Sequence, residues 1–418
     1  KRPPPLRGLF FMATSISTAA LTISCTNECT LEESMILKFL NLSFVVTAAA
    51  LLFSGIFIST ESSADHGPEK MWKRQIKPYF TAHETGTIGP FKINIESFGK
   101  EQSRKVKQIK EQNFDKYFDD KHNLAAIVRK NNKIVYARFD NDKRINSQTP
   151  LQGMSMSKTA LGAAVGSLVC DGSIKSLDDE IGLYAIGLQD SPYSDVLIRN
   201  VLQMNSGVTP LDRKDVKLAN QMAMGMKKFA GKADVLAAVR HFKGTKRKQG
   251  EQHNYHAADS FALSVLIFEL TGKSAAQIFY ENIVKKFGPD GKIHWAADNR
   301  GRTVSQARLV MTAPQWNAFG QFIIDEIKSN SCMGKFFKEG ISVSVPTSRK
   351  NVKYGFQFWV YNVDGESTIT MTGHGGFFNI LSVEKNTVIS IFSIDEKYKA
   401  GNLFGDGVLS RIASEIVM

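Results

Sequence analysis

The sequence predicts an α+β fold: a central antiparallel β-sheet built from both ends of the domain, flanked by helices, with an all-helical subdomain. Three observations lead to this prediction. Runs rich in β-branched and aromatic residues occur at 123–140. Similar runs return beyond residue 350. Between these regions, apolar residues recur at helical spacing. One sheet that joins both strand regions, with the helices as an insertion, accommodates all three observations.

The elements before residue 172 follow from local patterns. A strongly charged helix is expected at 101–120. The runs NLAAIVRK and KIVYARFD flank Asn131-Asn132, which predicts a β-hairpin, because asparagine tolerates the left-handed backbone of a tight turn. A helix from about 155 to 170 is ended by Asp171-Gly172.

The rest of the chain is helical first and strand-like afterwards. Residues 196–240 are expected to be helical, with a break at QMNSGV, residues 203–208. The stretch FALSVLIFELTG, residues 261–272, is a further apolar helix that ends at Gly272. Four strands and a final helix are then expected, at 354–362, 367–376, 379–385, 387–394 and 405–417.

Residues 39–60 carry no charge, which is typical of a membrane span or of the apolar region of a signal peptide. Met35 followed by Lys38 resembles a start with a short basic region, and Ser62-Ser63-Ala64 offers a cleavage site. We therefore expect 35–64 to be a signal peptide or a membrane anchor. Residues 1–34 would be upstream read-through or an extra N-terminal segment.

A rival signal begins with Lys1, Arg2 and Arg7 and continues through the uncharged residues 8–27. Either signal predicts an exported protein that is periplasmic, secreted or anchored facing outward. Residues 65–110 mix Pro, Gly and His without periodicity and are expected to be a lead-in segment on the surface. The main folded domain is expected at 111–418.

The net charge of +13 would suit nucleic acid, an anionic cell-envelope surface or acidic substrates. No basic stripe interleaved with aromatic residues occurs, so nucleic acid is not an expected partner, whereas an envelope surface stays a candidate. The densest basic run, KGTKRK at 243–248, is interpreted as a solvated loop. Cys170 and Cys332 remain after the N-terminal segment, and they could pair outside the cytoplasm.

The stretch GMSMSKTALG, residues 153–162, places Ser155 and Lys158 three residues apart at the start of an apolar helix. That spacing puts an amine within reach of a hydroxyl, and a helix start stabilises developing negative charge. About two Ser-x-x-Lys matches are expected by chance in a chain of this length, and Ser97–Lys100 is another. A helix-capping serine is the simpler alternative for Ser155.

Features further along the chain resemble, in order, the serine hydrolases of the β-lactamase and penicillin-recognising superfamily. The resemblance is nearest to class C-like esterases and aminohexanoate-oligomer hydrolases. The hairpin AAIVRKNNKIVYARF precedes the Ser155 helix, and SDVLIRNVLQMNSGV is similar to the family's next helix and turn. NYHAADSFALSVLIFELTGKS resembles its tyrosine-bearing loop, and YGFQFWV and GHGGFFNILSVEKNTVISIFS resemble its closing strands. The resemblance covers roughly residues 115–415 and implies a β-lactamase-like fold.

The resemblance also implies roles for individual residues. Ser155 would be the nucleophile and Lys158 the residue that takes or shares its proton. Tyr255 would relay protons to the leaving group and activate water. His374-Gly375-Gly376 stands where many members have Lys-Thr-Gly on a strand that binds substrate. The backbone N–H groups of Ser155 and Phe377 would form the oxyanion hole.

Two departures from the family pattern narrow the range of activities that we expect. The family commonly has Asn two places after the tyrosine, where this chain has Ala257, so an amide is missing unless Asn254 or Asp259 supplies it. His374 replaces a lysine, which removes a permanent cation for a substrate carboxylate. Both changes argue against an efficient β-lactamase or peptidoglycan carboxypeptidase.

We therefore expect an exported serine hydrolase that cleaves an ester or amide of a small molecule through an acyl-enzyme, without metal or organic cofactor. His253 and His256 lack the carboxylate or cysteine company of a metal site. Alternatives are a β-lactamase or D-Ala-D-Ala carboxypeptidase, and a non-catalytic envelope sensor. Uncharged substrates are expected to be preferred at neutral pH, unless another cation, such as one from 243–248, binds an anionic substrate.

Overall fold

The computed structural model describes most of residues 85–393 and the helix at 406–417. The gaps are residues 89–90, 100–105, 107, 110–113, 120–121, 142–144, 209–212, 243, 245–246 and 289–290. The expectations for residues 1–64, and for the first part of the lead-in segment, lie outside the described residues.

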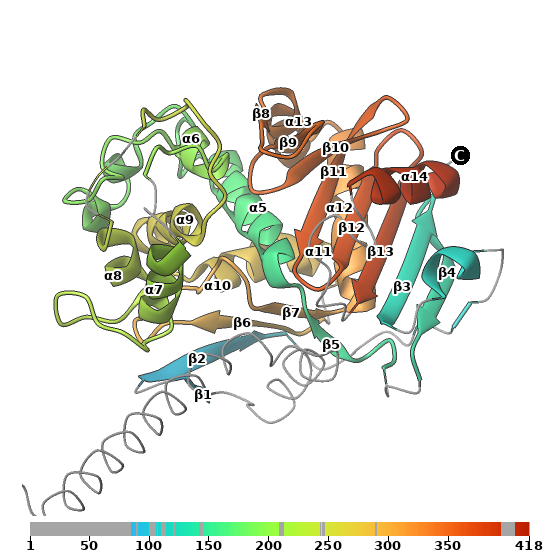
Figure 1. Ribbon diagram of the computed structural model, residues 1–418, viewed down its shortest axis with the longest axis horizontal. Coiled ribbons are helices and arrows are strands. Elements are labelled where there is room, and N and C mark those ends of the chain that lie inside the picture. The colour runs from blue at the N-terminus through green and yellow to red at the C-terminus, as the bar shows by residue number, and fades with distance from the viewer. Residues whose placement is uncertain are drawn as a thin grey trace, which may run out of the picture. The chain divides into compact units, whose positions relative to one another are not determined.

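The predicted α+β fold is confirmed, with an antiparallel sheet of eight strands in the order β4-β3-β13-β12-β11-β10-β9-β8 (Figure 1). The N-terminal hairpin and the C-terminal strands share this sheet, as expected, because β3 pairs with β13. The strands are β3 (Asn123–Lys130), β4 (Lys133–Phe139), β8 (Val345–Pro346), β9 (Val352–Tyr354), β10 (Trp359–Val363), β11 (Glu366–Gly373), β12 (Phe377–Ser382) and β13 (Thr387–Ser393).

The hairpin turn is the one that the sequence predicts: Asn131 and Asn132 both have positive φ, 48° and 64°. The expected strand at 354–362 is instead divided between β9 and β10. Much of the charged helix expected at 101–120 lies outside the described residues, and the expectation is wrong at Ile109. In the described part of that stretch only α4 (Asp115–Phe118) is helical, and Ile109 forms a β-bridge with Ala137 of β4. Pairing with that strand overrides a weak helical preference.

Helices cover both faces of the eight-stranded sheet. One face of β3, β12 and β13 packs against α12 (Ala313–Lys328), and the opposite face packs against α14 (Asp406–Val417) (Figure 1). β12 and β13 are buried along their whole length, so they show no polar–apolar alternation. The final helix, α14, was predicted from the sequence.

A second sheet of five strands, in the order β1-β2-β6-β7-β5, was not predicted. Two of its strands, β1 and β2, lie in the expected lead-in segment and pair with each other, and β2 also pairs with β6, a strand far later in the chain. Its members are β1 (Thr85–Ile88), β2 (Phe91–Phe98), β5 (Pro150–Gln152), β6 (Ile293–Ala297) and β7 (Leu309–Thr312).

The helical subdomain lies between β5 and β6 in the chain. Its helices are α5 (Ser157–Cys170), α6 (Ile198–Leu202), α7 (Arg213–Ala223), α8 (Val235–Arg240), α9 (Ala257–Thr271), α10 (Ala275–Phe279) and α11 (Lys285–Phe287), with 3₁₀ turns η1 (Met154–Met156), η2 (Ile181–Leu183) and η3 (Ile186–Leu188) and a π-turn, η4 (Tyr280–Val284). The break expected at 203–208 follows α6. Gly272 ends α9 with φ 68°, as predicted.

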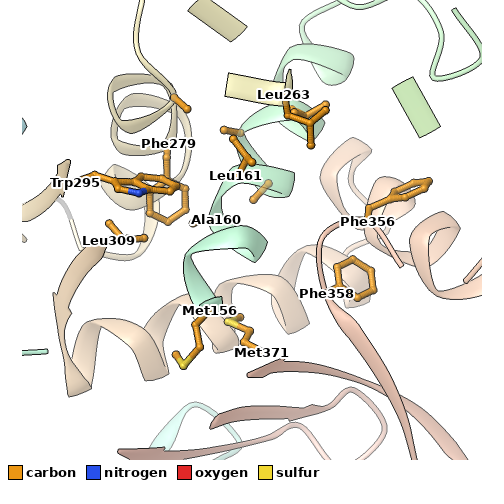
Figure 2. Close-up of a cluster of buried hydrophobic side chains, with 14 of the residues drawn as sticks. Met156, Ala160, Leu161, Leu263, Phe279, Trp295, Leu309, Phe356, Phe358 and Met371 are labelled. Atoms are coloured by element: carbon orange, nitrogen blue, oxygen red, sulfur yellow. The ribbon is translucent and has the colours of Figure 1, made fainter. Parts of the chain in front are cut away.

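Helix α5 is the buried axis of the core. Its residues 157–168 are all buried, and Figure 2 shows Ala160 and Leu161 surrounded by large side chains. These come from α9, α10, β6 and the bend before β10: Leu263, Phe279, Trp295, Phe356 and Phe358. A helix packed on all sides holds its N-terminal end rigidly, and that end carries Ser155.

A disulfide joins Cys170, the last residue of α5, to Cys332, the first residue of α13 (Cys332–Ser342), with the two Cα atoms 5.7 Å apart. The sequence left this pairing open.

Within the described residues, no single helix is long and apolar enough to cross a bilayer, and α9 passes that test only together with residues 275–287, across a 79° bend.

Candidate active site

Ser155 lies in the 3₁₀ turn η1, directly before α5. Ser157 holds this turn in place: its Oγ donates to the Met154 carbonyl (2.6 Å) and accepts from the Leu309 N–H (3.0 Å). Met154 has φ 47°, an unusual backbone conformation for a residue with a side chain. The two serines therefore differ in role. Ser157 is fully buried and its hydroxyl is used in two hydrogen bonds, whereas Ser155 lines a cavity.

Lys158 lies one turn into the core from Ser155, and its residue surface is only 3% exposed. Its Nζ donates to Ser155 Oγ at 3.3 Å and to the Gln306 carbonyl at 2.5 Å. The backbone carbonyl fixes the amine, so the lysine side chain points at the serine hydroxyl. The sequence-predicted pair is thus in contact.

Tyr255 lies in the loop before α9, and its ring centroid is 5.0 Å from Lys158 Nζ. The ring stacks on Trp359 of β10 with centroids 5.2 Å apart. Tyr255 is 38% exposed, and its hydroxyl has no hydrogen-bond partner among the residues that the structure describes. The structure therefore places the ring face of Tyr255, the third predicted residue, against Lys158, and Tyr255 lines the same cavity as Ser155.

The residues expected on a substrate-binding strand lie at its end. β11 ends at Gly373, and His374, Gly375 and Gly376 form the turn to β12. The two glycines have φ 95° and 91°, which suits glycine. His374 is exposed and lines the cavity, whereas the two glycines do not line it. Phe377 is buried at the start of β12, opposite Gly373.

Gly373 lets the strand approach the Ser155 turn closely. A Cβ at this position would lie 2.6 Å from the Gly153 carbonyl and 3.2 Å from Met154 Cβ. Only glycine permits that distance. The backbone at Gly373 and Phe377 is therefore held beside η1, where a pair of N–H donors for an oxyanion would have to be.

Ser155, Tyr255 and His374 border one cavity of about 610 Å³. Sequence reasoning missed most of its wall, including Arg349, Trp359 and Tyr361; Arg247 was assigned only to a solvated basic loop. The remaining lining residues are Gln252, His253, Asn254, Ser348, Thr372, Gly373 and Phe378. A single arginine in a loop gives no sequence signal, whereas the aromatic residues of FWVY were interpreted only as strand formers.

Asn254 and Asp259 are the two residues that could replace the side-chain amide missing at Ala257. Asn254 borders the cavity, and Asp259 does not. Asp259 is fully buried, and its Oδ1 accepts from Tyr193 Oη and Ser206 Oγ, both at 2.7 Å. Burial raises the pKa of Asp259 to about 7. This carboxyl therefore belongs to a buried network behind the site.

The two histidines near Tyr255 in the sequence, His253 and His256, are largely buried, and the pKa of each is lowered. His256 caps α9, since its Nδ1 accepts from the Ala258 N–H at 3.1 Å, and burial lowers its pKa to about 3. Its Nε2 lies 3.6 Å from Asp259, but a histidine with so low a pKa is neutral and forms no ion pair. Burial, and then the charge of Arg349, lowers the pKa of His253 to about 4.

The Beta-lactamase family profile matches residues 111–402. No curated protein matches the sequence. Among solved structures, a protein assigned as a 6-aminohexanoate-dimer hydrolase from Bacillus anthracis is similar, with 19% identity, a TM-score of 0.69 and coverage of 86% of this chain and 97% of that one.

Two further structures have the same fold. A penicillin binding protein from Bacillus halodurans has 15% identity and a TM-score of 0.56, covering 74% of this chain and 100% of that one. A family VIII carboxylesterase has 15% identity and a TM-score of 0.54, covering 73% and 95%. At these identities the structural likeness is evidence for the fold alone. Because the family profile spans most of the domain, the resemblance found in the sequence is confirmed: the chain belongs to the Beta-lactamase family and is an enzyme of the serine hydrolase type.

Proposed function

We propose that the protein hydrolyses an ester or amide of a small molecule through an acyl-enzyme on Ser155. The observation that carries the proposal is the contact of Lys158 Nζ with Ser155 Oγ at 3.3 Å and with the Tyr255 ring at 5.0 Å, at the edge of a cavity. An activated nucleophile needs a base within hydrogen-bond reach, and Lys158 meets that requirement.

In the acylation step, Ser155 Oγ attacks the carbonyl carbon and its proton passes to Lys158 or Tyr255. The carbonyl oxygen becomes an oxyanion, which the backbone N–H groups of Ser155 and Phe377 stabilise. The bond to the leaving group then breaks, and Tyr255 supplies the proton that the leaving alcohol or amine takes. The acyl group remains on Ser155 as an ester.

In the deacylation step, a water enters where the leaving group was. Tyr255 takes a proton from the water as it attacks the acyl carbon, and Ser155 leaves with a proton returned through Lys158. The exposure of Tyr255 supports this role, because the residue is 38% exposed, lines the cavity, and its hydroxyl has no competing partner among the described residues.

The test is covalent labelling with a fluorophosphonate, followed by peptide mapping, in the parent and in Ser155→Ala. The parent is expected to carry one phosphonylated residue, Ser155, and the variant none. Ser155→Ala should also lose hydrolysis of an activated ester at unchanged melting temperature. Labelling of another serine, or undiminished turnover in the variant, would assign the chemistry elsewhere.

Two other functions are tested by the same material. A penicillin-type carboxypeptidase or a β-lactamase would form an acyl-enzyme with a fluorescent penicillin, which we do not expect, because His374 stands in place of the strand lysine. A non-catalytic envelope sensor would bind ligand without turnover. The contact between Lys158 and Ser155 argues against a sensor, since ligand binding alone does not require it.

We also propose that the protein is exported, with residues 35–64 as signal peptide or anchor, and faces an anionic envelope. The uncharged run at 39–60 and the Cys170–Cys332 disulfide support this, because disulfides persist in oxidising compartments. Cell fractionation with thiol labelling is the test. A cytoplasmic protein with both thiols reduced would contradict export.

A further inference from the structure

Gln357 lies in the bend between β9 and β10 and has an unusual backbone for a residue with a side chain. Its φ is 65°, in the left-handed region that favours glycine, and the residue is only 1% exposed. It does not line the cavity and has no part in the reaction steps given above. A conformation that costs energy at a buried position must be offset by contacts of the residue that adopts it.

The contacts of Gln357 join the bend to three helices. Its side-chain Oε1 accepts from Ser260 Oγ in α9 at 2.9 Å. Its Nε2 donates to the carbonyls of Leu202 (3.0 Å) and Val201 (3.4 Å) at the end of α6, and its backbone N–H also donates to the Leu202 carbonyl, at 2.9 Å. Its own carbonyl accepts from Thr159 Oγ1 in α5 at 3.1 Å. Gln357 is therefore a junction with all of its polar groups in use.

Two of these helices hold the candidate acid and base. Thr159 directly follows Lys158 in α5, so the bond from Gln357 fixes the bend against the turn that carries the lysine. Ser260 lies in the first turn of α9, and Tyr255 stands in the loop that leads into that turn. One buried side chain thus connects the helix of the lysine to the helix that follows the tyrosine.

The bond to α6 leads to the tyrosine loop by a second path. Gln357 holds the Leu202 carbonyl, and Met204 lies two residues further along the same segment. The Met204 carbonyl accepts from the N–H of Asn254 at 2.7 Å. Asn254 is the neighbour of Tyr255 in the chain, so the position of Leu202 bears on that of the tyrosine.

A third path runs along the strand that the bend begins. Trp359 is two residues after Gln357, and its ring stacks on that of Tyr255 with the centroids 5.2 Å apart. The Tyr255 ring in turn lies 5.0 Å from Lys158 Nζ. The three paths from Gln357 therefore converge on the tyrosine, and the bond to Thr159 ties them to the lysine.

We propose that Gln357 is a positioning residue for the reaction, which sets the separation between Lys158 and Tyr255. This inference rests on the proposed function, in which the lysine takes the serine proton and the tyrosine gives a proton to the leaving group. Both groups must face the same reacting bond. A shift of about 1 Å between them can lower the rate by up to about 10²-fold.

The test compares two acetate esters whose leaving groups differ in their need for a proton. 4-Nitrophenolate leaves 4-nitrophenyl acetate as an anion, whereas the alcohol of benzyl acetate needs the proton from Tyr255. Gln357→Gly suits the left-handed bend but removes the side chain, and it should lower the benzyl-to-nitrophenyl ratio of kcat/KM by about tenfold. Ser260→Ala removes one bond of the junction and should lower the ratio by about threefold or more. A purely structural defect would lower kcat/KM for both esters alike.

The matched control is Ser264→Ala. Ser264 lies one turn after Ser260 in α9 and is equally buried, and its Oγ donates to the Thr303 carbonyl at 2.7 Å. The control therefore removes a buried hydrogen bond of the same kind that does not involve Gln357. Its ratio should stay within about twofold of the parent's. Tyr255→Phe is the reference, and its ratio should fall at least as far as that of Gln357→Gly.

A folded Gln357→Gly or Ser260→Ala protein with the parent's ratio would overturn the proposal, and so would a fall in Ser264→Ala as large as in Ser260→Ala. Ser260→Ala decides alone if Gln357→Gly does not fold. Failure of the two ideas is distinguishable. Hydrolysis that survives Ser155→Ala, or an unchanged ratio in Tyr255→Phe, refutes the proposed function, whereas a ratio that falls only in Tyr255→Phe refutes the positioning role alone.

Discussion

Ser155 and Ser157 are two residues apart in the same turn, and their replacement by alanine should have opposite effects. Ser157→Ala removes the hydroxyl that donates to the Met154 carbonyl and accepts from the Leu309 N–H. The Leu309 N–H is then left buried without an acceptor. Loss of one partner of a buried hydrogen bond costs about 1–3 kcal/mol in the free energy of unfolding. Ser155 lines the cavity, so Ser155→Ala should cost less than about 1 kcal/mol.

The assay is urea and thermal unfolding of both variants, with fluorophosphonate labelling of each. For a domain of this size, 1 kcal/mol shifts the melting temperature by roughly 2–4 °C, so the loss in Ser157→Ala is measurable. This variant should still be labelled at Ser155, but more slowly, because the turn that holds the proposed nucleophile is looser. A Ser157→Ala protein of parental stability, or one that loses labelling while Ser155→Ala keeps it, would refute the distinction between the two serines.

Three further predictions follow from contacts described above. Lys158→Met keeps the length of the side chain but removes the proposed base, and kcat for an activated ester should fall by about 10²-fold or more in stopped-flow assays; a smaller loss would assign the base elsewhere. Because burial raises the pKa of Asp259 to about 7 from 3.8, the folded protein holds a proton that the unfolded chain releases, and this stabilisation is lost as pH rises through 7. The melting temperature of Asp259→Asn should therefore rise relative to the parent's between pH 5 and 8 in calorimetry, and a constant difference would contradict the raised pKa. Replacing Cys170 and Cys332 by serine opens a long loop and should lower the free energy of unfolding by up to about 5 kcal/mol, whereas an unchanged urea midpoint would show that the disulfide adds nothing.

The sequence predicts those parts of the fold that depend on short-range patterns. The hairpin at Asn131-Asn132 and the end of α9 at Gly272 need a particular residue to adopt positive φ, and that residue is visible in the sequence. The five-stranded sheet was missed because its strands are short or paired with distant segments. β5 has three residues, and β6 is mostly buried and shows no alternation that would distinguish it from a loop or a helix turn.

From the sequence, only those residues of the candidate site could be predicted that are linked by a short, recognisable spacing along the chain. Ser155 lies in η1 and Lys158 three residues later in α5, and the structure brings them into contact. Arg349 was missed because its position in the site comes from stacking on Trp359, a contact between a loop and a strand that no local pattern specifies. The place of His374 in a turn instead of on a strand likewise depends on the pairing of Gly373 with Phe377.

The pairing of β3 with β13 determines when this protein can finish folding. β3 leaves the ribosome long before β13 and α14, and α14 covers one face of the same strands. Until then the N-terminal hairpin presents an apolar strand with one edge open, and such an edge pairs readily with other chains. Contacts between segments so far apart also form slowly. Until β13 is available, the open edge of β3 is therefore exposed to aggregation, and truncation before β13 would make that state permanent.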